Sequence, residues 1–212
     1  MKERFSKFIN KNLKLIVAVA IIVAIAMGFL LMLISGNADD RSEVPIDPTA
    51  EQQEDKKDKK DRLLVSADDH PGVSDVALDM YNARVDDITD TAQIAQLVEA
   101  SEMREELGGY LITLKLKGEE KALVISFEKV LMDGEDAAFD EVATWYAEQF
   151  LALIEEADTV KWTYQIDGKK KLTEKTLTLE QANDLLGTDD IKTYSETPEL
   201  VQTLLNNQKG IV

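Results

Sequence analysis

An uninterrupted apolar run near the N-terminus restricts this chain more than any other feature of its sequence. Residues 15–34 contain no charged residue and no polar side chain. At about 1.5 Å of rise per residue, a helix of this length spans about 30 Å, the thickness of the hydrocarbon core of a bilayer. A single segment satisfies its own backbone hydrogen bonds in lipid only as a helix. We therefore predict one transmembrane helix over residues 15–35, with the lipid bilayer contacted through residues 15–34.

The charges that flank this run predict its orientation. Residues 1–14 carry a net charge of +4, whereas the acidic residues Asp39, Asp40 and Glu43 follow the run. An excess of basic residues marks the cytoplasmic side, so we expect a cytoplasmic N-terminal tail and an extracytoplasmic remainder, held at the cell membrane. A signal peptide cleaved after Ala38 is the alternative, but the apolar core of a signal peptide is only about 7–15 residues long.

A charged stretch with few apolar residues separates this predicted helix from the rest of the chain. Residues 36–62 hold nine acids and six bases, and such a composition buries too little apolar surface to offset the loss of chain entropy. We expect a flexible linker there and one folded domain over residues 63–212, which is an ordinary domain size. That domain has 31 acids against 13 bases, and its net charge of −18 disfavours binding to nucleic acid.

Two segments of the domain have the 3.6-residue period of amphipathic helices. In residues 136–157 the apolar side chains fall on one side of the helix, so that Glu141 and Glu148 are expected opposite them, on a solvated face. Trp145 falls on the flank of the same helix. These three residues are therefore candidates for an exposed partner surface. A shorter helix is predicted over residues 91–101, with Asp90 or Thr91 as its N-cap.

Two short helices are predicted closer to the C-terminus. Thr178 and Gln181 have the spacing of a capping box, and Gly187 is typical of the end of the helix that this box opens. Thr197 is the expected cap of the last helix, because Pro198 suits its first position.

Alternating apolar residues predict strands that pair as hairpins. One hairpin is expected over residues 110–127. A second follows the strand at 160–166, where Asp167 and Gly168 favour a tight turn into a lysine-rich edge strand at 169–175. Helices come between the hairpins, so the predicted class is α+β: an antiparallel sheet of hairpins with helices packed on one face, preceded by a single transmembrane helix.

Residues that could carry catalysis or bind a cofactor are scarce. The chain has one histidine and no cysteine, which excludes a thiolate metal site and a Cys–His pair. Asp68, Asp69 and His70 form a weak candidate for a metal site, and a surface turn is the competing interpretation of this Asp-Asp-His-Pro-Gly segment. We therefore expect no cofactor, no metal centre and no enzymatic activity.

Acidic clusters leave one catalytic alternative open. Glu141, Glu148 and the acids within residues 133–136 could supply the carboxylate pair of a hydrolase. The acids around Gly134 lack the spacing of a calcium-binding loop. Their competing interpretation is that of solvated loop and helix-cap residues.

Three stretches in the second half of the chain are similar in sequence and order to a known protein family. They are Phe150-Leu-Ala-Leu-Ile-Glu-Glu-Ala-Asp-Thr-Val-Lys-Trp-Thr-Tyr164, Leu177-Thr-Leu-Glu-Gln-Ala-Asn-Asp-Leu-Leu-Gly187 and Asp190-Ile-Lys-Thr-Tyr-Ser195. In this order, residues 80–207 resemble the family called domain of unknown function 4825. The resemblance implies a location outside the membrane of a Gram-positive bacterium, on an anchor or attached to a sensor-like membrane protein. It implies no functional residue, because the matching positions are core and cap residues.

Together these features predict a single-pass, membrane-anchored extracytoplasmic protein that binds or senses a partner in the bacterial cell envelope without catalysis. The expected partner is an envelope or membrane protein, and the expected role is in signalling. Two alternatives stay open. One is a carboxylate-dependent hydrolase of the cell envelope, and the other is a structural or assembly factor whose lysine-rich edge strand pairs with a partner strand.

Overall fold

The computed structural model describes residues 43–46, 64–117 and 120–209, which belong to a compact unit that begins at Ser42. The predicted transmembrane residues 15–34 and most of the predicted linker lie outside the described residues. Within the described residues, no helix is long and apolar enough to cross a membrane. The elements are, in chain order, β1 (Glu43–Ile46), η1 (Ala67–Asp69), α2 (Asp75–Asn82), α3 (Thr91–Ala100), α4 (Met103–Leu107), β2 (Tyr110–Lys117), β3 (Glu120–Leu131), α5 (Asp136–Leu153), β4 (Thr159–Ile166), β5 (Thr173–Thr178), α6 (Leu179–Leu186), η2 (Ile191–Ser195) and α7 (Pro198–Lys209).

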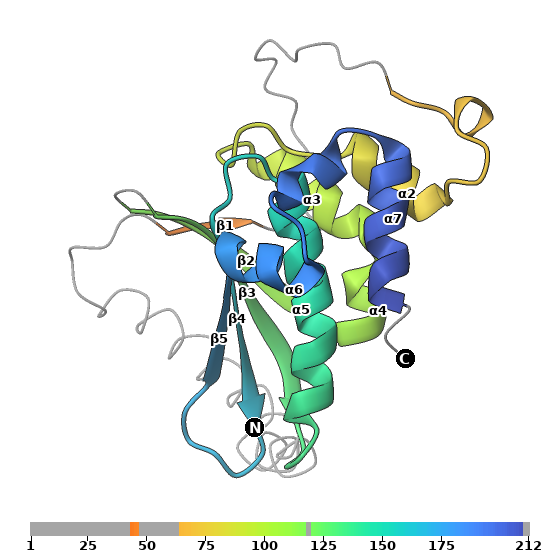
Figure 1. Ribbon diagram of the computed structural model, residues 1–212. Coiled ribbons are helices and arrows are strands. Elements are labelled where there is room, and N and C mark those ends of the chain that lie inside the picture. Colours follow the sequence, from red (N-terminus) through yellow and green to blue (C-terminus); the bar gives the residue numbers. More distant parts are fainter. Residues whose placement is uncertain (1–42, 47–63, 118–119, 210–212) are drawn as a thin grey trace, which may run out of the picture. The chain divides into compact units, whose positions relative to one another are not determined.

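The strands form one sheet in the order β1-β2-β3-β4-β5 (Figure 1). The pairs β1–β2, β2–β3 and β4–β5 are antiparallel, whereas β3 and β4 are parallel. The α+β class is therefore confirmed, but the prediction of a wholly antiparallel sheet is wrong. The reason is α5, which carries the chain from the end of β3 back along the sheet, so that β4 starts at the same end as β3.

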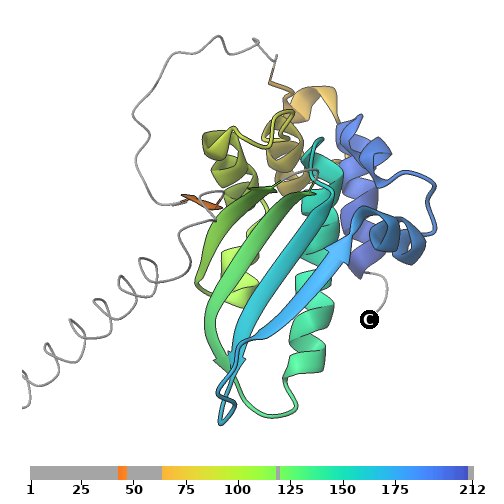
Figure 2. The same cartoon turned by 90° about the vertical axis from the view of Figure 1, so that its left-hand side faces the viewer.

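The helices lie on one face of the sheet and leave the other face uncovered (Figure 2). Successive side chains of a strand point to opposite faces, and burial in β4 follows this alternation. Val160, Trp162, Tyr164 and Ile166 are buried on the helix side, while the residues between them are half-buried. The core of the domain therefore lies between the sheet and the helices.

A row of aromatic rings fills this core from β2 to β4. The ring centroids of Tyr110 and Phe127 are 6.3 Å apart, those of Phe127 and Phe139 are 5.0 Å apart, and those of Phe139 and Tyr164 are 5.1 Å apart. All three contacts are edge-to-face, a geometry that aromatic quadrupoles favour. Phe139 of α5 thus contacts both β3 and β4.

Several local signals for helix ends are confirmed. Asp90 caps α3 by accepting a hydrogen bond from the backbone of Gln93 at 3.0 Å. Both hydrogen bonds of the Thr178–Gln181 capping box are present at the start of α6, and Gly187 ends that helix with a φ of 62°. These residues act on backbone groups within one turn, so they need no tertiary contact to be effective.

Two predicted boundaries are wrong. Glu43–Ile46, within the predicted linker, forms β1 and pairs with β2. The lysine-rich segment at 169–175 is mostly a turn, because β5 begins only at Thr173. The three consecutive lysines therefore lie at the end of the sheet rather than along its edge.

Candidate functional site

The predicted metal candidates do not converge on a site. Asp68 and Asp69 are exposed in the single turn η1, and the Nδ1 atom of His70 lies 2.6 Å from the Oε1 atom of Glu199 in α7. This hydrogen bond holds the pKa of the Glu199 carboxyl below its ordinary value. Among the residues that the structure describes, no group of three histidine or acidic side chains could hold a metal ion. His70 instead joins the start of the domain to its last helix.

The three residues predicted as a partner surface on α5 do not share one surface. Glu141 is exposed, Trp145 is half-buried and Glu148 is only 4% exposed, so the predicted solvated position of Glu148 is wrong. Seven residues separate the two glutamates, and a helix of that length rises about 10 Å. The structure therefore does not bring them together as a carboxylate pair.

Glu148 belongs to a buried polar cluster between α5 and α7. The Nε2 atom of Gln208 donates to Glu148 Oε2 and to the carbonyl of Trp145, both at 2.9 Å. The Oε1 atom of Gln208 accepts from Gln149 Nε2 at 2.9 Å. The side chain of Gln208 thus fixes α7 on the side of α5 that the sequence predicts to face solvent. Burial raises the pKa of the Glu148 carboxyl, and the hydrogen bond from Gln208 opposes that rise.

We expect Glu148→Gln to have a higher free energy of unfolding than the wild type at about pH 8, and we expect this difference to shrink towards about pH 4.5. A raised pKa means that the folded chain keeps a proton that the unfolded chain has already released. The wild type therefore loses stability as the pH rises through this range, while the neutral amide does not. Urea unfolding over this pH range measures the difference. Glu141→Gln, an exposed change on the same helix, is the control, and a difference that is independent of pH would contradict the prediction.

A second polar cluster, which the sequence does not single out, centres on Asp140 of α5. Its Oδ1 atom accepts a hydrogen bond from Trp162 Nε1 at 3.0 Å. Its Oδ2 atom accepts from the hydroxyl of Tyr164 at 2.9 Å and lies 2.8 Å from Lys175 Nζ. The two aromatic residues are two positions apart in β4 and so lie on the same face of the sheet. Lys175 is the β5 partner of Trp162 in the sheet register. One carboxylate thus joins α5 to two strands.

The geometry of this cluster suits a structural connection better than a reaction. Tyr164 is fully buried, and burial together with the hydrogen bond to Asp140 raises the pKa of its phenol, which therefore stays a hydrogen-bond donor. The side chain of Asp140 is 18% exposed, and its two oxygens already accept from three groups. We interpret the cluster as a set of polar contacts that holds α5 against the β4–β5 hairpin.

Lys192 of η2 closes the end of α5 in a similar way. Its ammonium group donates to the carbonyls of Leu151 and Ile154 at 2.5 Å and to the carbonyl of Ala157 at 3.0 Å. Burial lowers the pKa of Lys192 to about 8, against the opposite effect of nearby carboxylates. Because all three N–H bonds have acceptors, the amine is a helix cap and is not presented to a ligand.

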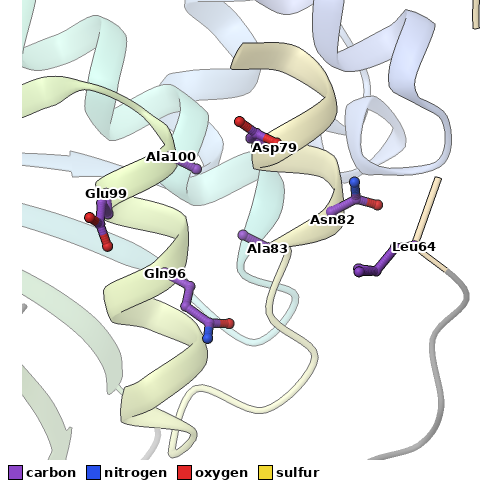
Figure 3. Close-up of a pocket in the computed structure, with 7 residues that line it drawn as sticks. All are labelled: Leu64, Asp79, Asn82, Ala83, Gln96, Glu99 and Ala100. Atoms are coloured by element: carbon purple, nitrogen blue, oxygen red, sulfur yellow. The ribbon is translucent and has the colours of Figure 1, made fainter. Parts of the chain in front are cut away.

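A shallow depression of about 310 Å³ lies between α2 and α3 (Figure 3). Asp79, Asn82 and Glu99 are among its lining residues, and the exposed side chain of Leu64 stands at its margin. Asn82 pairs with the backbone of Val65 through two hydrogen bonds of 2.9 and 3.0 Å, so its amide serves the chain itself. The depression is open to solvent and does not enclose a ligand.

The uncovered face of the sheet is a second exposed surface, separate from the depression between α2 and α3. It is polar: the hydroxyl of Thr163 donates to that of Ser126 at 3.2 Å, and Lys161 pairs with Glu120. The aromatic side chains of β2 to β5 all belong to the buried core on the other side. By register and alternation, the uncovered face includes Leu111, Thr113, Lys115, Glu120, Val124, Ser126, Lys161, Thr163, Gln165, Glu174 and Thr176.

Charge is divided unevenly between the sheet and the rest of the domain. The strand segments 110–131 and 159–178 hold nine lysines and five acids, a net charge of +4. The rest of residues 63–212 holds four bases and 26 acids, a net charge of −22. An acidic partner is therefore repelled less by the strands than by the helices and their loops.

Comparison with known proteins adds no relative: no protein-family model, no curated protein and no solved structure matches the chain. The resemblance to domain of unknown function 4825 stays a prediction from the sequence, as does the location that it implies.

Proposed function

We propose that this protein is a single-pass, membrane-anchored extracytoplasmic module that binds an envelope or membrane protein without catalysis, as part of signalling. The uneven charge of the domain is the observation that carries the proposal. Antiparallel sheets often leave one face in water, so an uncovered face alone is weak support. The strand segments carry +4 and the remainder −22, and the uncovered face itself is balanced, with Lys115 and Lys161 against Glu120 and Glu174. It therefore repels an acidic partner less than the helices and their loops do.

The polar chemistry of the uncovered face supports reversible binding. Hydroxyl groups from four strands, with Ser126 and Thr163 among them, can each donate and accept a hydrogen bond. Lys115 and Lys161 lie beside them, and Lys161 forms an ion pair with Glu120. The face has few large apolar side chains, and obligate interfaces are usually more apolar than this. A transient partner with a polar surface is therefore the kind that it fits.

The free edge of β5 supports a second candidate, a structural or assembly factor. Within the described residues β5 pairs only with β4. Its other edge therefore offers backbone N–H and C=O groups to an added strand. This mode would place a partner strand next to the same uncovered face.

Site-specific photo-cross-linking in intact cells tests the proposal. A benzophenone amino acid at Thr176, an exposed position on the uncovered face, is expected to give a discrete adduct with one partner. The same amino acid at Thr203, an exposed position on α7, is the matched control and is expected to give none. Adducts from Thr203 alone, or no adduct from Thr176, would contradict the assignment of the binding face.

A further inference from the structure

Exposed apolar side chains gather at one end of the sheet. Val130 is 54% exposed, Met132 is 60% exposed and Leu172 is 62% exposed. These are three of the six large apolar side chains that are exposed within the described residues. A group of this kind on the surface of a domain marks contact with another protein or with a membrane.

The sheet register places these side chains next to one another. Val130 of β3 is the register partner of Gln165 in β4. Leu172 directly precedes β5 and so falls on the other side of Gln165 from Val130. Met132 lies two residues after Val130, directly after the end of β3 at Leu131. Figure 2 shows this end of the sheet at the foot of the view, where β3 leaves for α5 and β4 turns into β5.

Three consecutive lysines lie in the turn beside these side chains. Lys169, Lys170 and Lys171 are all exposed. The amide of Gln165 donates to the carbonyl of Ile166 at 2.9 Å and also to the carbonyl of Lys169, which holds the turn against β4. The charged residues at this end of the sheet, within 128–136 and 167–172, are Glu128, Lys129, Asp133, Glu135, Asp136, Asp167 and the three lysines.

The charges at this end nearly cancel, which sets it apart from the rest of the domain. It holds four lysines and five acids, a net charge of −1, and the other residues of 63–212 carry −17. Glu135 is engaged within its own turn, where it accepts a hydrogen bond from the backbone of Met132 at 2.9 Å. This end is therefore less anionic than the domain as a whole, and it repels an anionic surface less.

We propose that the sheet tip, which we define as Val130, Met132, Lys169–Lys171 and Leu172, inserts into the headgroup region of a bilayer that contains anionic lipids. Aliphatic side chains beside lysines are the chemistry of interfacial membrane contact: the apolar groups enter the acyl boundary and the lysines meet anionic headgroups. A protein partner would more often be met by aromatic or arginine side chains, and the tip has neither. The inference rests on the proposed membrane anchor, which would keep a bilayer close to the domain.

The length of the chain allows this contact. Residues 35–42 join the apolar run to β1, and the nine peptide steps that end at Glu43 span at most about 30 Å. Glu43 is the register partner of Lys115, which in turn pairs with Ala122 of β3. The eight residues from Ala122 to Val130 rise about 26 Å. An extended segment can therefore run the length of the sheet.

An environment-sensitive fluorophore on a single cysteine tests the inference in the full chain, which has no cysteine of its own. We expect Leu172→Cys, labelled and reconstituted in phosphatidylcholine vesicles, to gain fluorescence roughly twofold, with a blue shift, when phosphatidylglycerol is included. Leu185→Cys on α6 is the matched control, because Leu185 is 63% exposed but lies outside the tip, and it should not change. Changing Lys169, Lys170 and Lys171 to glutamine in the Leu172→Cys chain should abolish the dependence on anionic lipid.

Flotation of the same vesicles separates this inference from the proposed anchor. If the chain floats with the vesicles but labelled Leu172→Cys does not respond, the tip proposal is wrong and the anchor stands. If the chain does not float, the anchor is wrong, and vesicles added to the labelled chain then test the tip alone, with no response contradicting it. A response that depends on protein concentration and not on anionic lipid would show that a second copy covers the tip, and would also overturn the proposal.

Discussion

Replacing Asp140 with alanine is expected to lower the free energy of unfolding by about 3–4 kcal/mol, the largest stability effect that we predict for a polar residue of this domain. The substitution removes the acceptor for Trp162 Nε1 and for the hydroxyl of Tyr164, which lies in a fully buried side chain. It also leaves Lys175 without the carboxylate 2.8 Å away. A buried donor that loses its acceptor costs about 1–3 kcal/mol.

A double-mutant cycle distinguishes the loss of this network from the loss of helix packing. Asp140→Ala, Tyr164→Phe and the double variant would be unfolded in urea as a chain that begins at Ser42, with tryptophan fluorescence as the signal. We expect the double variant to be little less stable than Asp140→Ala, because removing the hydroxyl also removes the orphaned donor. Glu141→Ala, an exposed change one residue away, should alter the free energy by less than about 0.5 kcal/mol. Strictly additive effects, or a loss below about 1 kcal/mol for Asp140→Ala, would contradict the role given to Asp140.

Signals that act within one turn of a helix could be predicted from the sequence. Asp90 and Thr178 cap helices through bonds to backbone groups three residues away, at 3.0 and 3.3 Å. Such contacts depend on the local chain and hardly at all on tertiary structure. The alternation that predicts β4 is equally local, since it only requires that one face of the strand be buried.

The parallel pairing of β3 and β4 could not be predicted in this way. Two predicted hairpins with a helix between them are compatible with several orders of strands. The structure resolves the choice because α5 returns the chain along the sheet and Leu123 pairs with Val160 in parallel register.

The start of β5 could not be predicted either, because the turn signal does not set the length of the connection. Asp167 and Gly168 favour a two-residue turn, but the first register pair of the hairpin is Tyr164 with Thr173, so the connection is longer.

The position of Glu148 shows the limit of the amphipathic pattern. Eight apolar residues in one stripe predict that the opposite side of the helix faces water, and that is correct for Glu141. In the second half of α5 the opposite side is covered by α7, whose Gln208 reaches Glu148. A period of 3.6 residues predicts which side of a helix faces the core. It does not predict whether a second element covers the opposite side.

The clusters around Asp140 and Lys192 have no signature in the sequence. Asp140 meets Trp162, Tyr164 and Lys175 only because α5 crosses β4 and β5 at that point. Lys192 meets the end of α5 only because η2 packs there. Contacts between elements far apart in the chain need the topology, and the topology was the part of the prediction that failed.

Membrane topology is the central claim, and cysteine accessibility tests it most directly because the chain has no native cysteine. Ser6→Cys lies in the basic N-terminal tail, and Thr176→Cys lies at an exposed position on the uncovered face of the sheet. The excess of basic residues before the apolar run predicts that these two positions are on opposite sides of the membrane. Each cysteine is therefore either accessible or inaccessible to a reagent that stays outside the cell.

The measurement is labelling of intact cells with a maleimide that cannot cross the membrane, followed by labelling after permeabilisation. We predict that Thr176→Cys is labelled fully in intact cells, and that Ser6→Cys is labelled only after permeabilisation. Labelling of Ser6→Cys but not of Thr176→Cys in intact cells would contradict the orientation. Failure of both to react before permeabilisation would place the domain inside the cell and contradict the account of an extracytoplasmic binding module.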